Sequence, residues 1–132
     1  MSPEKINRII YIEDDPDMID LVSLILNRRG FSVQGAVGGV KGLDKVIAEL
    51  PDLVLLDLMM PDLDGWDVYQ QMKAHAKTRN IPVIVITAKA QAIDRVLGLR
   101  IAKVDDYICK PFSPKELIAS IDRIIEKNRF QV

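Results

Sequence analysis

Apolar residues follow two alternating patterns along the chain. Runs that are apolar at every position are typical of strands buried on both faces, as in a parallel sheet covered by helices. Between these runs, apolar residues recur every three or four positions, which is typical of a helix with one buried face. The strands predicted in this way cover residues 9–12, 31–36, 53–56, 82–87 and 105–110. Their strict alternation with helices predicts one parallel sheet with right-handed crossovers and helices on both faces.

Start and stop residues give the predicted helices their bounds. Asp15 followed by Pro16 is typical of an N-cap and a first helical residue, and Ser113 with Glu116 forms a capping box. The predicted helices run from Pro16 to just before Gly30, from Val40 to Leu50, from Trp66 to about Lys77, from Ala92 to Ala102, and from Pro114 onward. In the fourth of them we expect the large apolar side chains to face the sheet, namely Ile93, Val96, Leu97 and Ile101.

A glycine-rich stretch, residues 38–42, precedes the second predicted helix. It has neither the Gly-x-Gly-x-x-Gly order of a dinucleotide-binding loop nor the Gly-Lys-Ser/Thr ending of a P-loop, so we interpret it as a turn that leads into the helix. Because glycines in a first turn cost up to about 1 kcal/mol each, this helix is expected to be the weakest.

The length of 132 residues fits a single domain. We expect it to span residues 1–132, with a core from about 8 to 127 and no output domain in this chain. Eighteen basic residues oppose nineteen acidic ones, so the net charge gives no argument for direct nucleic-acid binding. The single cysteine cannot form an internal disulfide, and no apolar run approaches the ~18 residues of a membrane span. With no apolar signal segment at the N-terminus, these features predict a cytoplasmic protein without membrane contact.

Polar side chains follow the predicted strands at the places where they end. Glu13 and Asp14 follow the first strand and Asp57 the third, while Thr87 ends the fourth and Lys110 the fifth. The carboxyl ends of parallel strands open on one edge of the sheet, where ligands of open α/β sheets bind. We therefore expect these five side chains to share one site. Cap and turn roles are assigned instead to Asp15, Asp62, Asp64 and Asp105.

This set of residue types favours phosphoryl chemistry. Three carboxylates held together repel one another, and Lys110 neutralises only part of their charge. Oxygen ligands without cysteine or paired histidine favour Mg²⁺ or Mn²⁺ over zinc. Such an ion binds carboxylates together with phosphate oxygens, so a phosphoryl group is the expected ligand of the site and Asp57 is the expected nucleophile. Lys110 would stabilise a second phosphoryl oxygen, and the Thr87 hydroxyl or a backbone amide a third.

Four motifs resemble those of response-regulator receiver domains of bacterial two-component signalling. They are Glu13-Asp14-Asp15, Leu55 to Pro61 with Asp64-Gly65, Thr87-Ala88, and Lys110-Pro111-Phe112. The resemblance covers nearly the whole chain, residues 8–127. It implies a flavodoxin-like (CheY-like), doubly wound α/β/α fold with five strands and five helices. It also implies that Asp57 accepts a phosphoryl group from a sensor histidine kinase or phosphotransfer protein, and that the domain then regulates an unidentified output protein.

The resemblance implies a metal site with particular ligands. Asp14, Asp57 and the carbonyl of Met59 would bind Mg²⁺ directly, and Glu13 would act through water. In this family the domain assists its own phosphorylation and dephosphorylation but turns over no outside metabolite, so we do not expect an enzyme in the ordinary sense.

Phosphoryl binding and switching involve further residues in the same family. Thr87 and Lys110 would contact the phosphoryl group, and the bond between Lys110 and Pro111 would be cis. Tyr107 resembles the switch aromatic. A phosphoryl group on Asp57 would draw the Thr87 hydroxyl toward it and leave space that the Tyr107 ring can enter from solvent.

One segment departs from the family pattern. Receiver domains usually read Gly-Leu, two residues, then Gly-Ala-Asp-Asp, whereas here Gly98-Leu99 is followed by residues 100–104 before Asp105-Asp106. The segment is one residue longer and lacks the glycine that would take up the left-handed conformation. We therefore expect the end of the fourth helix to be built differently.

Four charged residues resemble positions that form ion pairs between the subunits of dimeric receivers attached to winged-helix DNA-binding domains. They are Arg95, Asp105, Glu116 and Lys127, on the face formed by the fourth helix, fifth strand and fifth helix. The resemblance suggests a phosphorylation-dependent homodimer, although exposed ion pairs contribute little individually.

Three other functions remain open. A phosphohydrolase of the haloacid-dehalogenase type also uses an aspartyl nucleophile and Mg²⁺, but it needs a second acid two residues later, where this chain has Met59. A flavodoxin-like cofactor binder would have a Ser/Thr/Gly-rich phosphate loop after the first strand, where this chain has three acids. A receiver-like module that is never phosphorylated is disfavoured, because every expected site residue is present.

Overall fold

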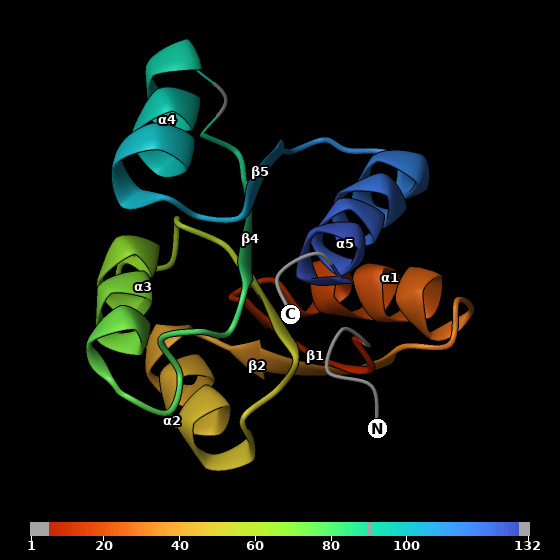
Figure 1. Cartoon of the computed structure of the whole chain (residues 1–132), viewed down its shortest axis with the longest axis horizontal. Helices are drawn as coiled ribbons and strands as arrows, with labels where there is room; N and C mark the ends of the chain where they lie inside the picture. Colours follow the sequence, from red (N-terminus) through yellow and green to blue (C-terminus); the bar gives the residue numbers. More distant parts are fainter. Residues whose placement is uncertain (1–5, 90, 130–132) are drawn as a thin grey trace.

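The computed structural model describes residues 6–89 and 91–129, which form three layers around a central sheet (Figure 1). The strands are β1 (Arg8–Glu13), β2 (Ser32–Val37), β3 (Leu53–Leu56), β4 (Val83–Thr87) and β5 (Asp106–Cys109). They lie in the order β2-β1-β3-β4-β5, and every neighbouring pair is parallel. The predicted doubly wound fold is confirmed, and the strand order reverses between β1 and β3.

Helices cover both faces of this sheet. They are α1 (Pro16–Asn27), α2 (Gly39–Glu49), α3 (Gly65–Ala74), α4 (Ala92–Val96), the π-helix η1 (Leu97–Ala102) and α5 (Pro114–Arg129). α1 and α5 cover one face, and α2, α3 and η1 cover the other (Figure 1). None of the helices in the described ranges has the length and apolar character needed to cross a bilayer.

Successive residues of the strands serve the two core layers alternately. In β1, Ile9 and Tyr11 pack in the layer under α1 and α5, whereas Ile10 and Ile12 pack in the layer under α2 and α3. All four side chains are buried. This two-sided burial is the physical reason why runs apolar at every position correctly predicted the central strands.

The predicted caps of α1 and α5 are confirmed. The Asp15 carboxylate accepts a hydrogen bond from the Asp17 N–H at 3.0 Å, and Pro16 is the first residue of α1. The Ser113 hydroxyl oxygen accepts the Glu116 N–H at 3.1 Å. Each cap satisfies an amide that the first turn of a helix leaves free.

The fourth predicted helix ends in an unusual way. Its α-helical part stops at Val96, and η1 continues with the wider i→i+5 turns of a π-helix, which hold the additional residue of this segment. Lys103 follows in the left-handed conformation, with φ 63° and ψ 41°. The expected difference at this helix end is confirmed, but the left-handed position is kept and is occupied by a lysine.

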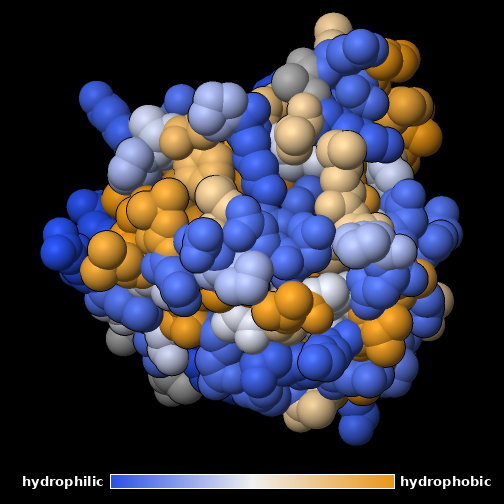
Figure 2. All heavy atoms as spheres, turned by 180° about the vertical axis from the view of Figure 1, so that it is seen from behind, coloured by the Kyte–Doolittle hydropathy of each residue, from blue (hydrophilic) through white to orange (hydrophobic). Residues whose placement is uncertain are grey.

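The expectation that the large apolar side chains of this segment face the sheet is wrong. They are exposed, as Ile93 (57%), Val96 (45%), Leu97 (46%) and Ile101 (71%) show. Apolar surface accordingly gathers over α4 at the upper right of Figure 2. The segment approaches the sheet through Gly98, where a Cβ atom would lie only 2.7 Å from the Tyr107 ring. The half-buried Leu99 and Ala102 pack against the core beside this contact, so these residues and Gly98, not the four exposed ones, form the inward face of the segment.

Candidate functional site

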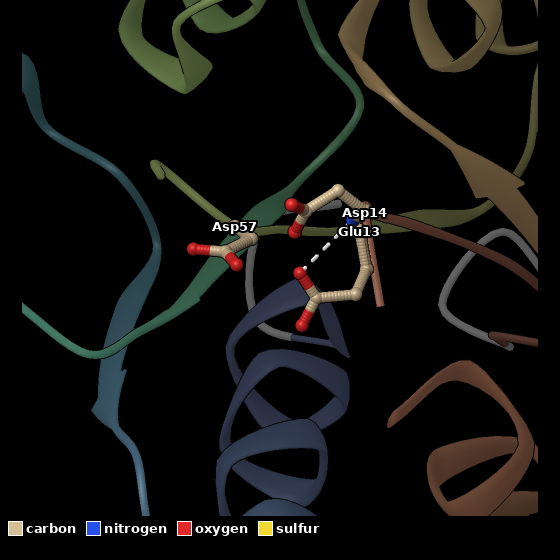
Figure 3. Close-up of side chains that lie close together, drawn as sticks. All are labelled: Glu13, Asp14 and Asp57. Carbon is tan, nitrogen blue, oxygen red and sulfur yellow. Dashed lines mark hydrogen bonds between the residues drawn. The ribbon is translucent and has the colours of Figure 1, made fainter. Parts of the chain in front are cut away.

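Three carboxylates meet at the ends of β1 and β3. Glu13 is the last residue of β1, Asp14 follows it, and Asp57 follows β3 on the neighbouring strand. The strand ends are joined by the Asp57 N–H, which donates to the Ile12 carbonyl at 3.0 Å. One oxygen of each carboxylate lies within 4.8 Å of the others (Figure 3). Glu13 and Asp57 are buried and Asp14 is exposed, so this acidic cluster opens to solvent on one side.

Lys110 brings a positive charge to the acidic cluster. Its ammonium contacts the Glu13 carboxylate and lies 3.1 Å from the Asp57 Oδ2. The peptide bond between Lys110 and Pro111 is cis, as expected. The lysine therefore belongs to the same network as two of the three acids.

Thr87 is the last residue of β4 and is fully buried. Its carbonyl accepts the Lys110 N–H at 2.8 Å, and its hydroxyl oxygen accepts the Lys89 N–H at 3.4 Å. The backbone of β4 thus fixes where Lys110 leaves β5. All five predicted site residues consequently lie at the carboxyl edge of the sheet.

Burial and shared hydrogen bonds set the charges in the acidic cluster. The pKa of Glu13 is raised to about 7, chiefly by burial and next by its hydrogen bond with Asp57, against the effect of Lys110. Burial also acts to raise the pKa of Asp57, but hydrogen bonds with Glu13, the Met59 amide and Lys110 outweigh it and lower that pKa. As the pH rises, Asp57 is therefore the first of the two carboxyls to lose its proton. The pKa of Lys110 is raised by the two carboxylates despite burial, so the lysine stays charged.

Tyr11 is a member of this network that the sequence analysis missed. Its buried hydroxyl donates to the Glu13 Oε1 at 3.0 Å. Burial and the nearby Glu13 carboxylate raise the pKa of this phenol, so it remains a donor. Residues two apart on a strand share one face, and this spacing was the available signal.

The acidic cluster fits a hard divalent cation. Carboxylate oxygens from Glu13, Asp14 and Asp57 lie close enough to share one ion. Oxygen ligands of this kind suit Mg²⁺ and Mn²⁺, and the exposed side of the cluster admits the waters that Mg²⁺ retains. The Met59 N–H donates to the Asp57 Oδ1 at 3.0 Å, which places Met59 in the turn beside the cluster.

Tyr107 lies beside Gly98 with its ring inside the protein. Its side chain is buried, and its hydroxyl donates to the Lys89 carbonyl at 2.8 Å. Arg95 donates to the Tyr107 carbonyl at 2.8 Å and lies 5.7 Å from the ring centroid. The inward position that the sequence analysis expected after phosphorylation is therefore already occupied in this structure.

The four charged residues expected on a dimer face have different surroundings. Arg95 and Glu116 line the same surface hollow of about 400 Å³. The Asp105 carboxylate instead accepts the Val83 N–H at 2.8 Å, next to β4. Lys127 is exposed on α5. The structure brings together one oppositely charged pair of the four.

The domain is doubly wound, and its acids, a threonine and a lysine lie together where the strand order reverses. This is the architecture of a phosphoacceptor signalling domain. The model of the response regulator receiver domain matches residues 9–122. The chain belongs to this family, as its motifs predicted.

Similar proteins are response regulators. The chain is 40% identical over 120 residues to the DNA-binding dual master transcriptional regulator RpaA of Synechocystis sp., covering 91% of this chain and 49% of RpaA. It is 38% identical over 121 residues to the DNA-binding response regulator MtrA of Mycobacterium tuberculosis, covering 92% of this chain and 51% of MtrA. The chain thus spans about half the length of these curated relatives.

Solved receiver structures share the fold. A CheY-like receiver domain protein from Methanospirillum hungatei superimposes with a TM-score of 0.84 at 29% identity, covering 97% of this chain and 100% of that one. The BeF3-activated N-terminal receiver domain of Klebsiella pneumoniae RstA gives a TM-score of 0.82 at 28% identity, covering 90% of this chain and 98% of that one. The predicted CheY-like fold is therefore confirmed, and this chain is the receiver domain of a two-component response regulator.

Proposed function

We propose that Asp57 is the residue that accepts the phosphoryl group, from a sensor histidine kinase or phosphotransfer protein. The observation that carries this assignment is the position of the buried Asp57 carboxylate, which lies beside Glu13 and Asp14 with its Oδ2 3.1 Å from the Lys110 ammonium. In the transfer, an Asp57 oxygen bonds to phosphorus while the bond from phosphorus to the donor imidazole nitrogen breaks, and its electron pair returns to that nitrogen. No general base is needed because the carboxylate has no proton to lose.

The acidic cluster would hold Mg²⁺ or Mn²⁺, with Asp14, Asp57 and the Met59 carbonyl as direct ligands and Glu13 acting through water. The ion supplies neutralisation of charge on the phosphoryl oxygens when it is bound. The support for this proposal is the spacing of the carboxylate oxygens, all within 4.8 Å.

Lys110 and Thr87 would stabilise the phosphoryl group itself. Lys110 is already charged and hydrogen-bonded to Asp57, so it needs little rearrangement to reach an oxygen of a phosphoryl group attached to that carboxylate. The Thr87 hydroxyl would bind a further oxygen from the end of β4. With these groups the domain assists its own phosphorylation and dephosphorylation and acts on no separate metabolite.

We place the output surface on α4, β5 and α5, with Thr87 and Tyr107 as the switch pair. Tyr107 contacts α4 through Arg95 and the segment after Thr87 through the Lys89 carbonyl, so it connects this surface to the site. The partner is an output protein or output domain in the cytoplasm. Because the chain carries a net charge of −1, we propose that the receiver itself does not bind nucleic acid.

The same surface would form a homodimer after phosphorylation. Arg95 and Glu116 are exposed and line one hollow, so both would be accessible to a second copy of the domain, while Asp105 and Lys127 lie outside that hollow. Sedimentation of the protein with beryllofluoride and Mg²⁺ tests the dimer. A monomer under these conditions removes the proposal.

The function itself is tested with acetyl phosphate and Mg²⁺, followed by intact-mass measurement. Wild-type protein should gain the mass of one phosphoryl group, and the Asp57→Asn variant should gain none. An unmodified wild type would favour a receiver-like module that is not phosphorylated. Modification of the Asp57→Asn variant would assign the phosphoryl group to another residue.

A further inference from the structure

The loop between β3 and α3 is bound to the start of α2 through Asp62. The Asp62 Oδ1 accepts the Gly39 N–H at 3.0 Å, and its Oδ2 accepts the Val40 N–H at 3.1 Å. At Gly38, α2 has no side-chain cap of its own, so Asp62 satisfies its amides from another part of the chain. These hydrogen bonds, from Gly39 first and then Val40, lower the pKa of Asp62 and keep it ionised at the positive end of the helix. Asp62 is therefore more than the turn residue that the sequence suggested.

The glycine-rich stretch before α2 permits this contact. Gly38 has a φ of +97°, in the region that favours glycine, and a Cβ atom there would lie 2.9 Å from the Asp62 Oδ2. The Gly38 N–H also donates to the Glu13 carbonyl at 3.1 Å. The start of α2 consequently binds both the end of β1 and the loop after β3, which are the two segments that carry the acidic cluster.

The loop that Asp62 anchors also contacts Asp57. The Met59 N–H donates to the Asp57 Oδ1 at 3.0 Å and contributes to the lowered pKa of that carboxyl. On the α3 side, the loop is held by the Gly65 N–H, which donates to the Leu58 carbonyl at 3.0 Å. Asp62 is the corresponding anchor on the α2 side.

We propose that Asp62 is a positioning residue for phosphoryl transfer. By binding the start of α2, it holds the β3–α3 loop so that the Met59 amide keeps its hydrogen bond to Asp57. The end of β1 and the loop after β3, which carry the acidic cluster, then keep their separation. This role rests on the proposed function of Asp57. Asp62 acts through the loop and not by contact with the phosphoryl group.

The test compares Asp62→Ala with a matched control, Asp52→Ala. Asp52 is also exposed, and its carboxylate accepts two backbone amides, from Asn7 at 3.0 Å and Arg8 at 2.8 Å, at the start of β1. Both variants lose two such hydrogen bonds, so their thermal stabilities should fall alike. Only Asp62→Ala should raise the Mg²⁺ concentration for half-maximal phosphorylation, by about tenfold, as expected when a group that orients metal ligands is removed.

A second measurement does not depend on phosphorylation. The ¹H–¹⁵N signal of the Met59 amide should shift in Asp62→Ala and stay in place in Asp52→Ala. If wild-type protein takes up no phosphate, the function of Asp57 fails, while the Met59 signal still decides whether Asp62 holds the loop. An unmoved Met59 signal, or wild-type Mg²⁺ dependence in Asp62→Ala, overturns the proposal.

A loss of negative charge near the metal must be separated from a loss of position. In about 1 M KCl the Debye length is ~3 Å, so an effect of charge alone should disappear, whereas the positional defect should persist. Asp62→Glu retains the charge with a longer side chain and should keep part of the defect. Should Asp62→Ala not fold, Asp62→Asn provides the same comparison with a polar side chain, and a defect confined to low salt overturns the proposal.

Discussion

The acidic cluster and the α4–η1 segment are neighbours in one small domain, but they are held in different ways. Glu13 and Asp57 are buried and paired with Lys110, so each charge depends on the others for its position. In the α4–η1 segment the backbone meets the sheet at Gly98, while large side chains such as Ile101 point to solvent. A site built from buried charges at strand ends follows from the strand pattern, whereas the inward face of this short segment depends on which of its residues, here Gly98, Leu99 and Ala102, meet the core.

Lys110→Met should have the largest effect. It removes the cation that lies 3.1 Å from Asp57, and losing one preorganised group of this kind lowers rates by about 10²- to 10³-fold. We expect such a decrease in the rate of phosphorylation by acetyl phosphate, measured by intact mass. Lys45→Met is the control, because Lys45 pairs with Glu49 on α2 at 2.8 Å, and it should react like wild type. Equal rates of phosphorylation for the two variants would contradict the proposed role of Lys110 in stabilising the phosphoryl group.

Metal-free protein should become less stable as the pH rises through the titration of Glu13. The pKa of Glu13 is raised from 4.5 to about 7 in the folded state, so its proton stabilises the fold at pH below about 4.5 and this contribution is lost as the pH rises through about 7. The loss should be on the order of 3 kcal/mol. Urea unfolding in EDTA at several pH values measures it, with Glu13→Gln as the variant that lacks this titration. A constant difference between the two proteins across this range would contradict the assignment.

Tyr107→Phe should cost about 1 kcal/mol, the usual contribution of one hydrogen bond. It removes the contact from the Tyr107 hydroxyl to the Lys89 carbonyl at 2.8 Å. The matched control is Tyr69→Phe, which removes a hydroxyl that donates to the Ala102 carbonyl, also at 2.8 Å. Both variants should be phosphorylated at the wild-type rate, because neither hydroxyl belongs to the acidic cluster. Slow phosphorylation of Tyr107→Phe alone would show that this hydroxyl contributes to phosphoryl transfer itself and not only to the connection with the output surface.

The sequence correctly predicted where the five proposed site residues lie, because strand ends determine their positions. Asp57 and Thr87 each follow or end a run buried on both faces, and parallel pairing brings such positions to one edge whatever the helices do. The role of the Tyr11 hydroxyl was missed because Tyr11 lies within an apolar run of the strand pattern, which indicates only that its ring is in the core and not that its hydroxyl contacts Glu13. Asp62 was only partly understood because its partners lie in α2, 22 and 23 residues away.

The inward face of the α4–η1 segment could not be predicted in the same way. A periodicity of 3.6 assumes an α-helix throughout, and the turns of η1 are π-helical. The additional residue in this segment was visible in the sequence and correctly indicated a changed helix end. Its direction was not visible, because that depends on the close contact of Gly98 with the Tyr107 ring.

Ile101→Gln should have the smallest effect, within about 0.5 kcal/mol of wild type in urea unfolding, because its side chain is 71% exposed. Val104 provides the matched comparison three positions later: it is 4% exposed and belongs to the core layer under α2 and α3. Val104→Ala should cost about 2 kcal/mol for the buried methyl groups it loses. If Ile101→Gln proved as costly as Val104→Ala, the side chain would be buried in solution, and the inward face predicted from the sequence would be the correct one.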